Sequence, residues 1–121
     1  MLKHLLLFLF FTACVVFGQA QKLKNGTYTY TIAFAEWGGK TMGATCTVII
    51  KGDSITVLHN GPGKLTGKKG DVLDKGILLK HTATGKWIIG HSSADKKAEE
   101  VGGCSGGPAV IDFRKKQWHT C

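Results

Sequence analysis

The sequence predicts an all-β fold, a small single-domain antiparallel barrel or sandwich of about seven or eight short strands. Glycine is abundant, with 17 residues, whereas proline is scarce, with 2. Residues branched at Cβ dominate the apolar stretches, and several of these stretches alternate with a period of two. All three features are typical of strands separated by turns. The segment near residues 93–101 is the one good helix candidate.

The first expected strand is Thr27–Ala35, with the sequence TYTYTIAFA. Its threonines alternate with Tyr28, Tyr30 and Ile32, so the threonines share one face of the strand. Trp37 follows in a turn, directly before Gly38 and Gly39, which makes it the best candidate for an exposed aromatic side chain.

A hairpin is expected over residues 44–60, with Gly52 and Asp53 as a two-residue loop in which glycine supplies a positive φ. This register places Cys46 opposite His59. The more apolar face, which we expect to be core, then holds Cys46, Val48, Ile50, Ile55, Val57 and His59.

A second hairpin is expected over residues 76–92, preceded by a short strand at Asp71–Asp74. A three-residue loop, Ala83–Gly85, pairs His81 with Trp87. The predicted core face holds Ile77, Leu79, His81, Trp87, Ile89 and His91.

The helix candidate begins at Ser92, with Asp95 three residues later as its capping-box partner. A closing hairpin follows, with strands at Pro108–Phe113 and Gln117–Cys121 and a turn between them. This register brings Cys121 opposite Val110.

Residues 1–20 are predicted to be a signal peptide, because a short basic start precedes an apolar run that ends in small residues. Residues 21–121 then form the single β domain, secreted or periplasmic, with no stable membrane span. An alternative is a lipid anchor at Cys14, because Phe11–Cys14 is similar to a bacterial lipobox.

The formal net charge of +8 raises the question of nucleic-acid binding. Arg114 is the only arginine, and the lysines are scattered over turns. Bidentate contacts to phosphate or guanine therefore have almost no donors. We expect no nucleic-acid partner and no cofactor, and an extracellular or periplasmic partner whose identity the sequence does not give.

Three cysteines remain outside the signal segment: Cys46, Cys104 and Cys121. In an oxidising compartment two of them are expected to pair. The closing hairpin and the glycine segment before it favour a Cys104–Cys121 disulfide with Cys46 buried and free. The alternative is Cys46–Cys104.

The segment Gly103–Pro108, GCSGGP, resembles the Gly-Asp-Ser-Gly-Gly-Pro motif of the chymotrypsin-like serine proteases over six residues. The resemblance implies a nucleophile at Ser105, with Cys104 replacing the family's aspartate. No histidine of this chain has the Ala-Ala-His-Cys context of that family. The alternative interpretation is a glycine turn held by a disulfide, in which Ser105 is an ordinary turn residue.

These observations favour a non-catalytic binding or structural module. Trp37, Ser105, Gly106 and Gly107 are the predicted interaction surface. One alternative is a hydrolase or a thiol- or metal-dependent protein using Cys46, His59 or Ser105. Another is a secreted enzyme inhibitor that presents the Gly102–Pro108 loop.

Overall fold

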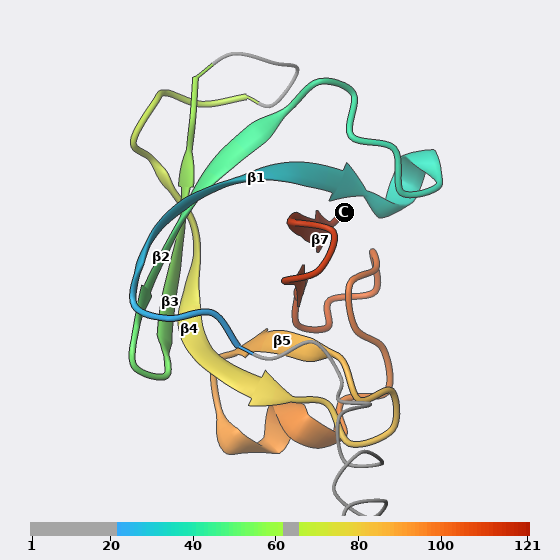
Figure 1. Cartoon of the computed structure of the whole chain (residues 1–121). Coiled ribbons are helices and arrows are strands. Elements are labelled where there is room, and N and C mark those ends of the chain that lie inside the picture. Colours follow the sequence, from blue (N-terminus) through green and yellow to red (C-terminus); the bar gives the residue numbers. More distant parts are fainter. Residues whose placement is uncertain (1–21, 62–65) are drawn as a thin grey trace, which may run out of the picture.

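Seven strands follow one another around a closed barrel in a computed structural model that describes residues 22–61 and 66–121 (Figure 1). The predicted signal peptide, 1–20, and the lipid-anchor residue Cys14 lie outside the described residues. The all-β prediction, which left barrel and sandwich open, is confirmed, and the architecture is a barrel. Its elements are β1 (Gly26–Phe34), η2 (Ala35–Trp37), β2 (Thr45–Lys51), β3 (Ser54–His59), β4 (Val72–Lys80), β5 (Trp87–Gly90), η3 (Ser93–Lys97), β6 (Val110–Asp112) and β7 (Gln117–Thr120).

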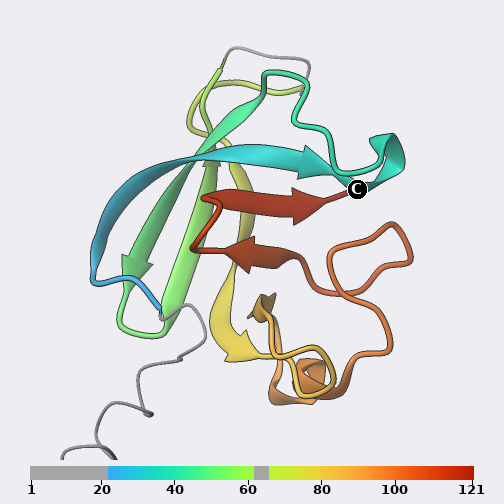
Figure 2. The ribbon, with the colours of Figure 1, turned by 45° about the vertical axis from the view of Figure 1, so that its right-hand side comes forward.

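The barrel closes through a parallel pairing of β1 with β7, from Thr31 opposite Gln117 to Phe34 opposite Thr120. All other neighbouring strands are antiparallel. Strands joined in sequence reverse direction at each step, so the first and last of seven run the same way. An odd number of strands can therefore close only with one parallel pair, which Figure 2 shows where β1 lies beside β7.

The β2–β3 hairpin has the predicted register, from Cys46 opposite His59 to Lys51 opposite Ser54. All six residues of its predicted core face are buried. β1 begins and ends one residue earlier than predicted, and its alternation buries Tyr30, Ile32 and Phe34. The barrel core is a single cluster that also contains Leu78, Ile89, Ile111, Phe113 and Trp118.

The β4–β5 hairpin differs from its prediction by one residue. Lys80, not His81, lies opposite Trp87, and β4 is one continuous strand that includes the short strand predicted at 71–74. Gly85 has a φ of 70° and donates its N–H to the His81 carbonyl, so the turn contains four residues. Leu78 and Ile89 therefore point into the barrel, whereas Ile77 is 48% exposed.

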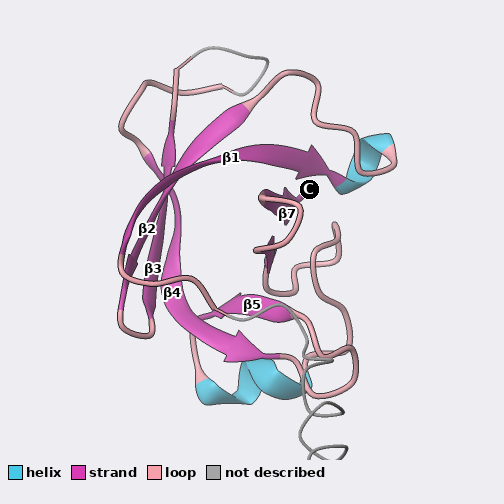
Figure 3. Ribbon diagram, viewed as in Figure 1, coloured by secondary structure: helices cyan, strands magenta, loops and turns pink. Residues whose placement is uncertain are grey.

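Segment 93–98 covers the outer face of β4 and β5 (Figure 3). The predicted helix is a five-residue 3-10 helix, η3, that ends at Lys97. Asp95 accepts the N–H of His91 rather than forming a capping box with Ser92. The buried His81 donates from Nε2 to the Ala98 carbonyl at 2.7 Å, which links the end of β4 to the residue after η3.

The β6–β7 hairpin differs from its prediction by two residues. His119, not Cys121, lies opposite Val110, and residues 113–116 form the turn. One carboxylate oxygen of Asp112 accepts the N–H groups of Arg114 and Lys115 at 3.0 and 2.8 Å. This local turn, which aspartate favours, sets the register.

A disulfide joins Cys104 to Cys121, the pairing that the sequence predicts, and Cys46 is a buried free cysteine. The disulfide ties the glycine-rich segment before β6 to the residue after β7. Within the described ranges, no helix has the length and apolar character needed to cross a membrane.

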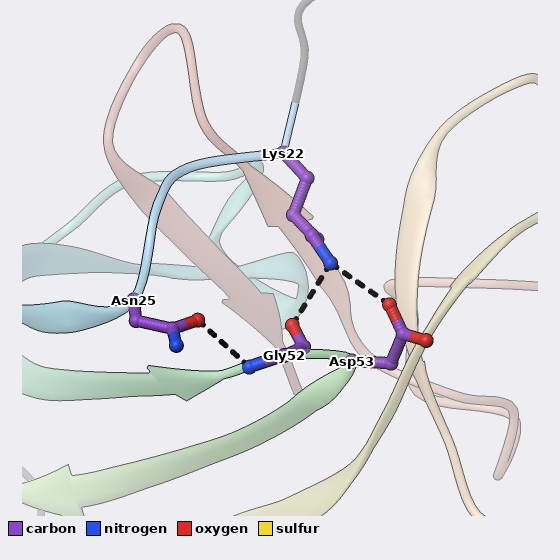
Figure 4. A network of polar contacts seen from close by, with 4 residues as sticks. All are labelled: Lys22, Asn25, Gly52 and Asp53. Carbon is purple, nitrogen blue, oxygen red and sulfur yellow. Dashed lines mark hydrogen bonds and ion pairs between the residues drawn. The ribbon is translucent and has the colours of Figure 1, made fainter.

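The chain before β1 is fastened to the β2–β3 turn by side-chain contacts (Figure 4). Lys22 Nζ donates to the Gly52 carbonyl at 2.9 Å and pairs with Asp53 at 2.8 Å. The side-chain oxygen of Asn25 accepts the N–H of Gly52. The hydrogen bond and charge of Lys22 lower the pKa of Asp53. These exposed contacts hold residues 22–25 against the turn.

Candidate functional site: a cleft between β5 and β6

β5 and β6 form the weakest junction in the barrel. They share one residue pair, Ile88 with Val110, beside which the Ile89 N–H donates to the Ala109 carbonyl. Beyond that pair, a cavity of about 390 Å³ lies between residues 85–87 and residues 110–115. A break in strand pairing thus opens a space of the size that small-molecule sites occupy.

The walls of this cleft are mainly apolar. They include Trp87, Val110, Ile111 and Phe113. The rings of Trp87 and Phe113 meet edge to face, with centroids 6.1 Å apart. Such a pair offers a flat aromatic surface and an edge to an apolar ligand.

The charged residues around the cleft are mostly basic. Lys86, Arg114 and Lys115 line it, against one acidic residue, Asp112. Because Asp112 accepts two backbone N–H groups of the β6–β7 turn, part of its charge is already stabilised locally. The cleft therefore favours a ligand that carries a negative group.

His119 supplies a polar atom beside the apolar walls. It lines the cleft, and its Nε2 is buried with no hydrogen-bond partner among the described residues. Burial lowers the pKa of His119, Lys86 and Lys115 lower it further, and Asp112 opposes the shift. An uncharged imidazole with an unsatisfied nitrogen is a group that a bound ligand can satisfy.

The predicted Cys46–His59 pair does face across the β2–β3 hairpin, with both side chains buried. Burial raises the pKa of the Cys46 thiol to about 12. His59 Nδ1 accepts the Gly61 N–H at 2.7 Å. In the described part of the chain, no three histidine, cysteine, aspartate or glutamate residues are placed to hold a metal ion.

Ser105 lies at the exposed tip of the glycine loop. It lines a cavity with Ala98, Glu99, Glu100, Gly106 and Gly107, a set without histidine. Within residues 22–61 and 66–121, no hydrogen bond joins Ser105 to a histidine, the base that the protease resemblance requires.

The rest of the Gly102–Pro108 loop packs against its own chain. A Cβ at Gly102 would lie 3.0 Å from the Val110 side chain, and one at Gly107 would collide with the Glu100 carbonyl oxygen. Pro108 is buried. The loop therefore presents only its tip, and the inhibitor function stays a prediction.

Trp37 is 40% exposed and its ring lies 5.1 Å from that of Phe34. It does not line the β5–β6 cleft or the cavity beside Ser105. The four residues of the predicted interaction surface are thus divided between η2 and the glycine loop.

Sequence reasoning missed the β5–β6 cleft. It assigned Trp87 to the core, against which this residue does pack, without its second place in the cleft lining. Its register for the last hairpin placed Cys121 where His119 lies. The sequence signal that could have corrected this register is Asp112, which directly precedes the turn. An aspartate there can accept the backbone N–H groups of the turn, as Asp112 does from Arg114 and Lys115.

Comparison with protein-family models, with curated proteins and with solved structures finds no match for this chain.

Proposed function

We propose that this chain is an exported, non-catalytic binding protein, secreted or periplasmic, that takes a small organic anion with an apolar or aromatic body into the β5–β6 cleft. This proposal rests mainly on one observation: a single cavity combines the Trp87–Phe113 pair, three basic side chains and the His119 Nε2, which has no hydrogen-bond partner among the described residues. An amphipathic anion complements all of these features.

The composition of the lining supports binding rather than catalysis. Among the described residues that line the cleft there is no serine, threonine or cysteine. The cleft therefore has no hydroxyl or thiol nucleophile for His119 to activate. The Cys104–Cys121 disulfide is consistent with an oxidising compartment, which supports export.

The test uses 8-anilinonaphthalene-1-sulfonate, a fluorescent aromatic anion, and N-phenyl-1-naphthylamine, its neutral analogue. We expect saturable binding of the anion that weakens as salt is added, because exposed charges are screened. The neutral analogue is expected to bind several-fold more weakly, since each rim cation contributes about 0.2–1 kcal/mol.

Two pairs of variants localise the binding. Trp87→Ala should abolish the fluorescence increase, whereas Trp37→Ala should leave it unchanged. Replacing Lys86 and Lys115 by glutamine should weaken binding, whereas the same change at the remote Lys96 and Lys97 of η3 should not. Equal binding of both probes, or binding that survives Trp87→Ala, would reject the proposal.

A further inference from the structure

We propose a second ligand site at the mouth of the barrel beside the end of β5, whereas the β5–β6 cleft lies at the start of β5. We infer that this second site binds a neutral polyhydroxyl ligand of monosaccharide size. The site is a cavity of about 410 Å³. It shares no lining residue with the β5–β6 cleft, so this inference does not depend on the proposed function.

The cavity lies where β5 ends at Gly90 and the chain leaves the barrel wall. Leu73 and Asp74 line it from the start of β4, and Trp118 and Thr120 line it from β7. Trp118 belongs to the barrel core, and Leu73 packs against that core, so the cavity borders the core. Barrel mouths of this kind are common ligand sites.

An unsatisfied donor is buried in this mouth. Trp118 is 5% exposed, and its indole Nε1 has no hydrogen-bond partner among the described residues. A buried donor left without a partner costs about 1–3 kcal/mol, which a ligand oxygen would recover.

An acceptor stands in the same cavity. Asp74 lies opposite the inward-facing Val57, and its side chain is 12% exposed. Its Oδ1 accepts the Lys75 N–H at 2.8 Å and pairs with His91 Nε2 at 3.0 Å. These contacts leave Oδ2 with no hydrogen bond to the described residues.

The polar groups that line this cavity favour a ligand with neutral hydroxyl groups. A hydroxyl both donates and accepts, so neighbouring hydroxyls of one ligand can satisfy the Asp74 carboxylate and the Trp118 N–H together. The Ser92 and Thr120 hydroxyls add two partners of the same kind. An anion would be repelled by Asp74 and Asp95, and a cation would leave the indole donor unpaired.

The wall that completes the site is the glycine loop. Gly106 and Gly107 line the cavity, and the disulfide fixes this loop beside Thr120. Gly106, with a φ of 88°, sits in the left-handed region. Two residues of the interaction surface predicted from the sequence thereby acquire a place in a site.

Proton–nitrogen NMR of the full chain tests this inference, because the three tryptophans give three indole signals. Substitution of each tryptophan by phenylalanine assigns them. Glucose, galactose, mannose and N-acetylglucosamine serve as probes at up to about 50 mM, since single-sugar affinities are expected near the millimolar range. At least one sugar should shift the Trp118 signal saturably and leave those of Trp37 and Trp87 in place.

Asp74→Asn should weaken that sugar about tenfold, the loss expected for one charge-assisted hydrogen bond. Asp53→Asn, at the exposed β2–β3 turn, is the matched control and should leave the affinity unchanged. If Asp74→Asn does not fold, as judged by signal dispersion, Thr120→Val replaces it with the same expectation of weaker binding.

Failure of all four sugars to move the Trp118 signal would overturn the inference, as would a saturable shift caused by methylammonium or acetate alone. The anionic naphthalene probe of the proposed function acts on the Trp87 signal instead. The two proposals therefore fail separately.

Discussion

Tyr30 and Cys46 lie opposite each other in the β1–β2 pair, and both side chains are buried inside the barrel. The Tyr30 hydroxyl has no hydrogen-bond partner among the described residues. Burial is the main cause that raises the pKa of Tyr30 to about 12, and it raises the pKa of Cys46 to about 12. The barrel interior thus holds two neutral polar groups.

Tyr30→Phe should leave the protein as stable or stabilise it by up to about 1 kcal/mol, because it removes a buried hydroxyl that lacks a partner. Tyr28→Phe is the matched control. The Tyr28 hydroxyl donates to the Lys24 carbonyl at 2.7 Å, so its loss should cost about 0.5–1.5 kcal/mol. Urea unfolding measures both, and a larger loss for Tyr30→Phe would contradict the assignment.

Alkaline pH should destabilise the barrel. The ordinary pKa is 9.0 for the Cys46 thiol and 10.0 for the Tyr30 hydroxyl, and burial raises both pKa values to about 12 in the folded chain. Between these limits the unfolded chain releases protons that the folded chain keeps, so the free energy of unfolding falls as pH rises from 9 to 12. Cys46→Ala should reduce this slope, measured by urea unfolding at several pH values. An unchanged slope would show that Cys46 does not contribute.

Acidic pH should destabilise the protein through His119. Its folded pKa lies below the ordinary 6.5, so the unfolded chain binds the proton first as pH falls. The stability that His119 contributes is therefore complete above pH 6.5 and is lost below it. His119→Gln should show a shallower decline in the free energy of unfolding between pH 7 and 5. Parallel declines in the two proteins would contradict this prediction.

Replacing Cys104 and Cys121 together by serine should lower the free energy of unfolding by about 3 kcal/mol, because the disulfide closes a loop with a sequence separation of 17. Denaturant titration under non-reducing conditions measures the loss. Reduction of the unmodified protein should produce a similar loss and have no further effect on the double variant. Equal stability with and without the bond would contradict the expected restraint.

Gly76→Ala should cost about 1–3 kcal/mol through overpacking. A Cβ at this position would collide with the Gly90 carbonyl oxygen and lie 3.0 Å from an Ile89 methyl group. Lys75→Ala, at the preceding exposed position of β4, is the control and should have little effect. Thermal unfolding compares the two, and equal midpoints would contradict the close packing of β4 on β5.

The β2–β3 hairpin could be predicted residue by residue because its apolar and polar positions alternate strictly around a glycine-containing loop. The β4–β5 hairpin could not. Leu78–Leu79 and Ile88–Ile89 are apolar on both faces, so a shift of one residue leaves the pattern nearly unchanged. Segment 93–98 buries the outer face of these strands, which explains why both faces are apolar.

The β5–β6 cleft was harder to predict for a different reason. It exists because strands distant in sequence pair at one position and then stop. No local sequence pattern indicates where the pairing of two such strands ends. The same holds for the barrel mouth, where Asp74 and Trp118 come from strands 44 residues apart in the chain. The residue types alone indicate which ligand groups the chain could bind. Which of these residues lie together in one site is visible only in the closed barrel.

The parallel contact between β1 and β7 also bears on the order in which the chain can fold. A ribosome or a translocation channel delivers β1 first, yet its edge from Thr31 to Phe34 has no neighbour until residues 117–120 arrive. We expect the six antiparallel junctions to form an open, curved sheet whose two edges, on β1 and β7, stay exposed until these two strands pair. Final closure then joins segments of high sequence separation, so it should be slow and should fail when the last strand is deleted.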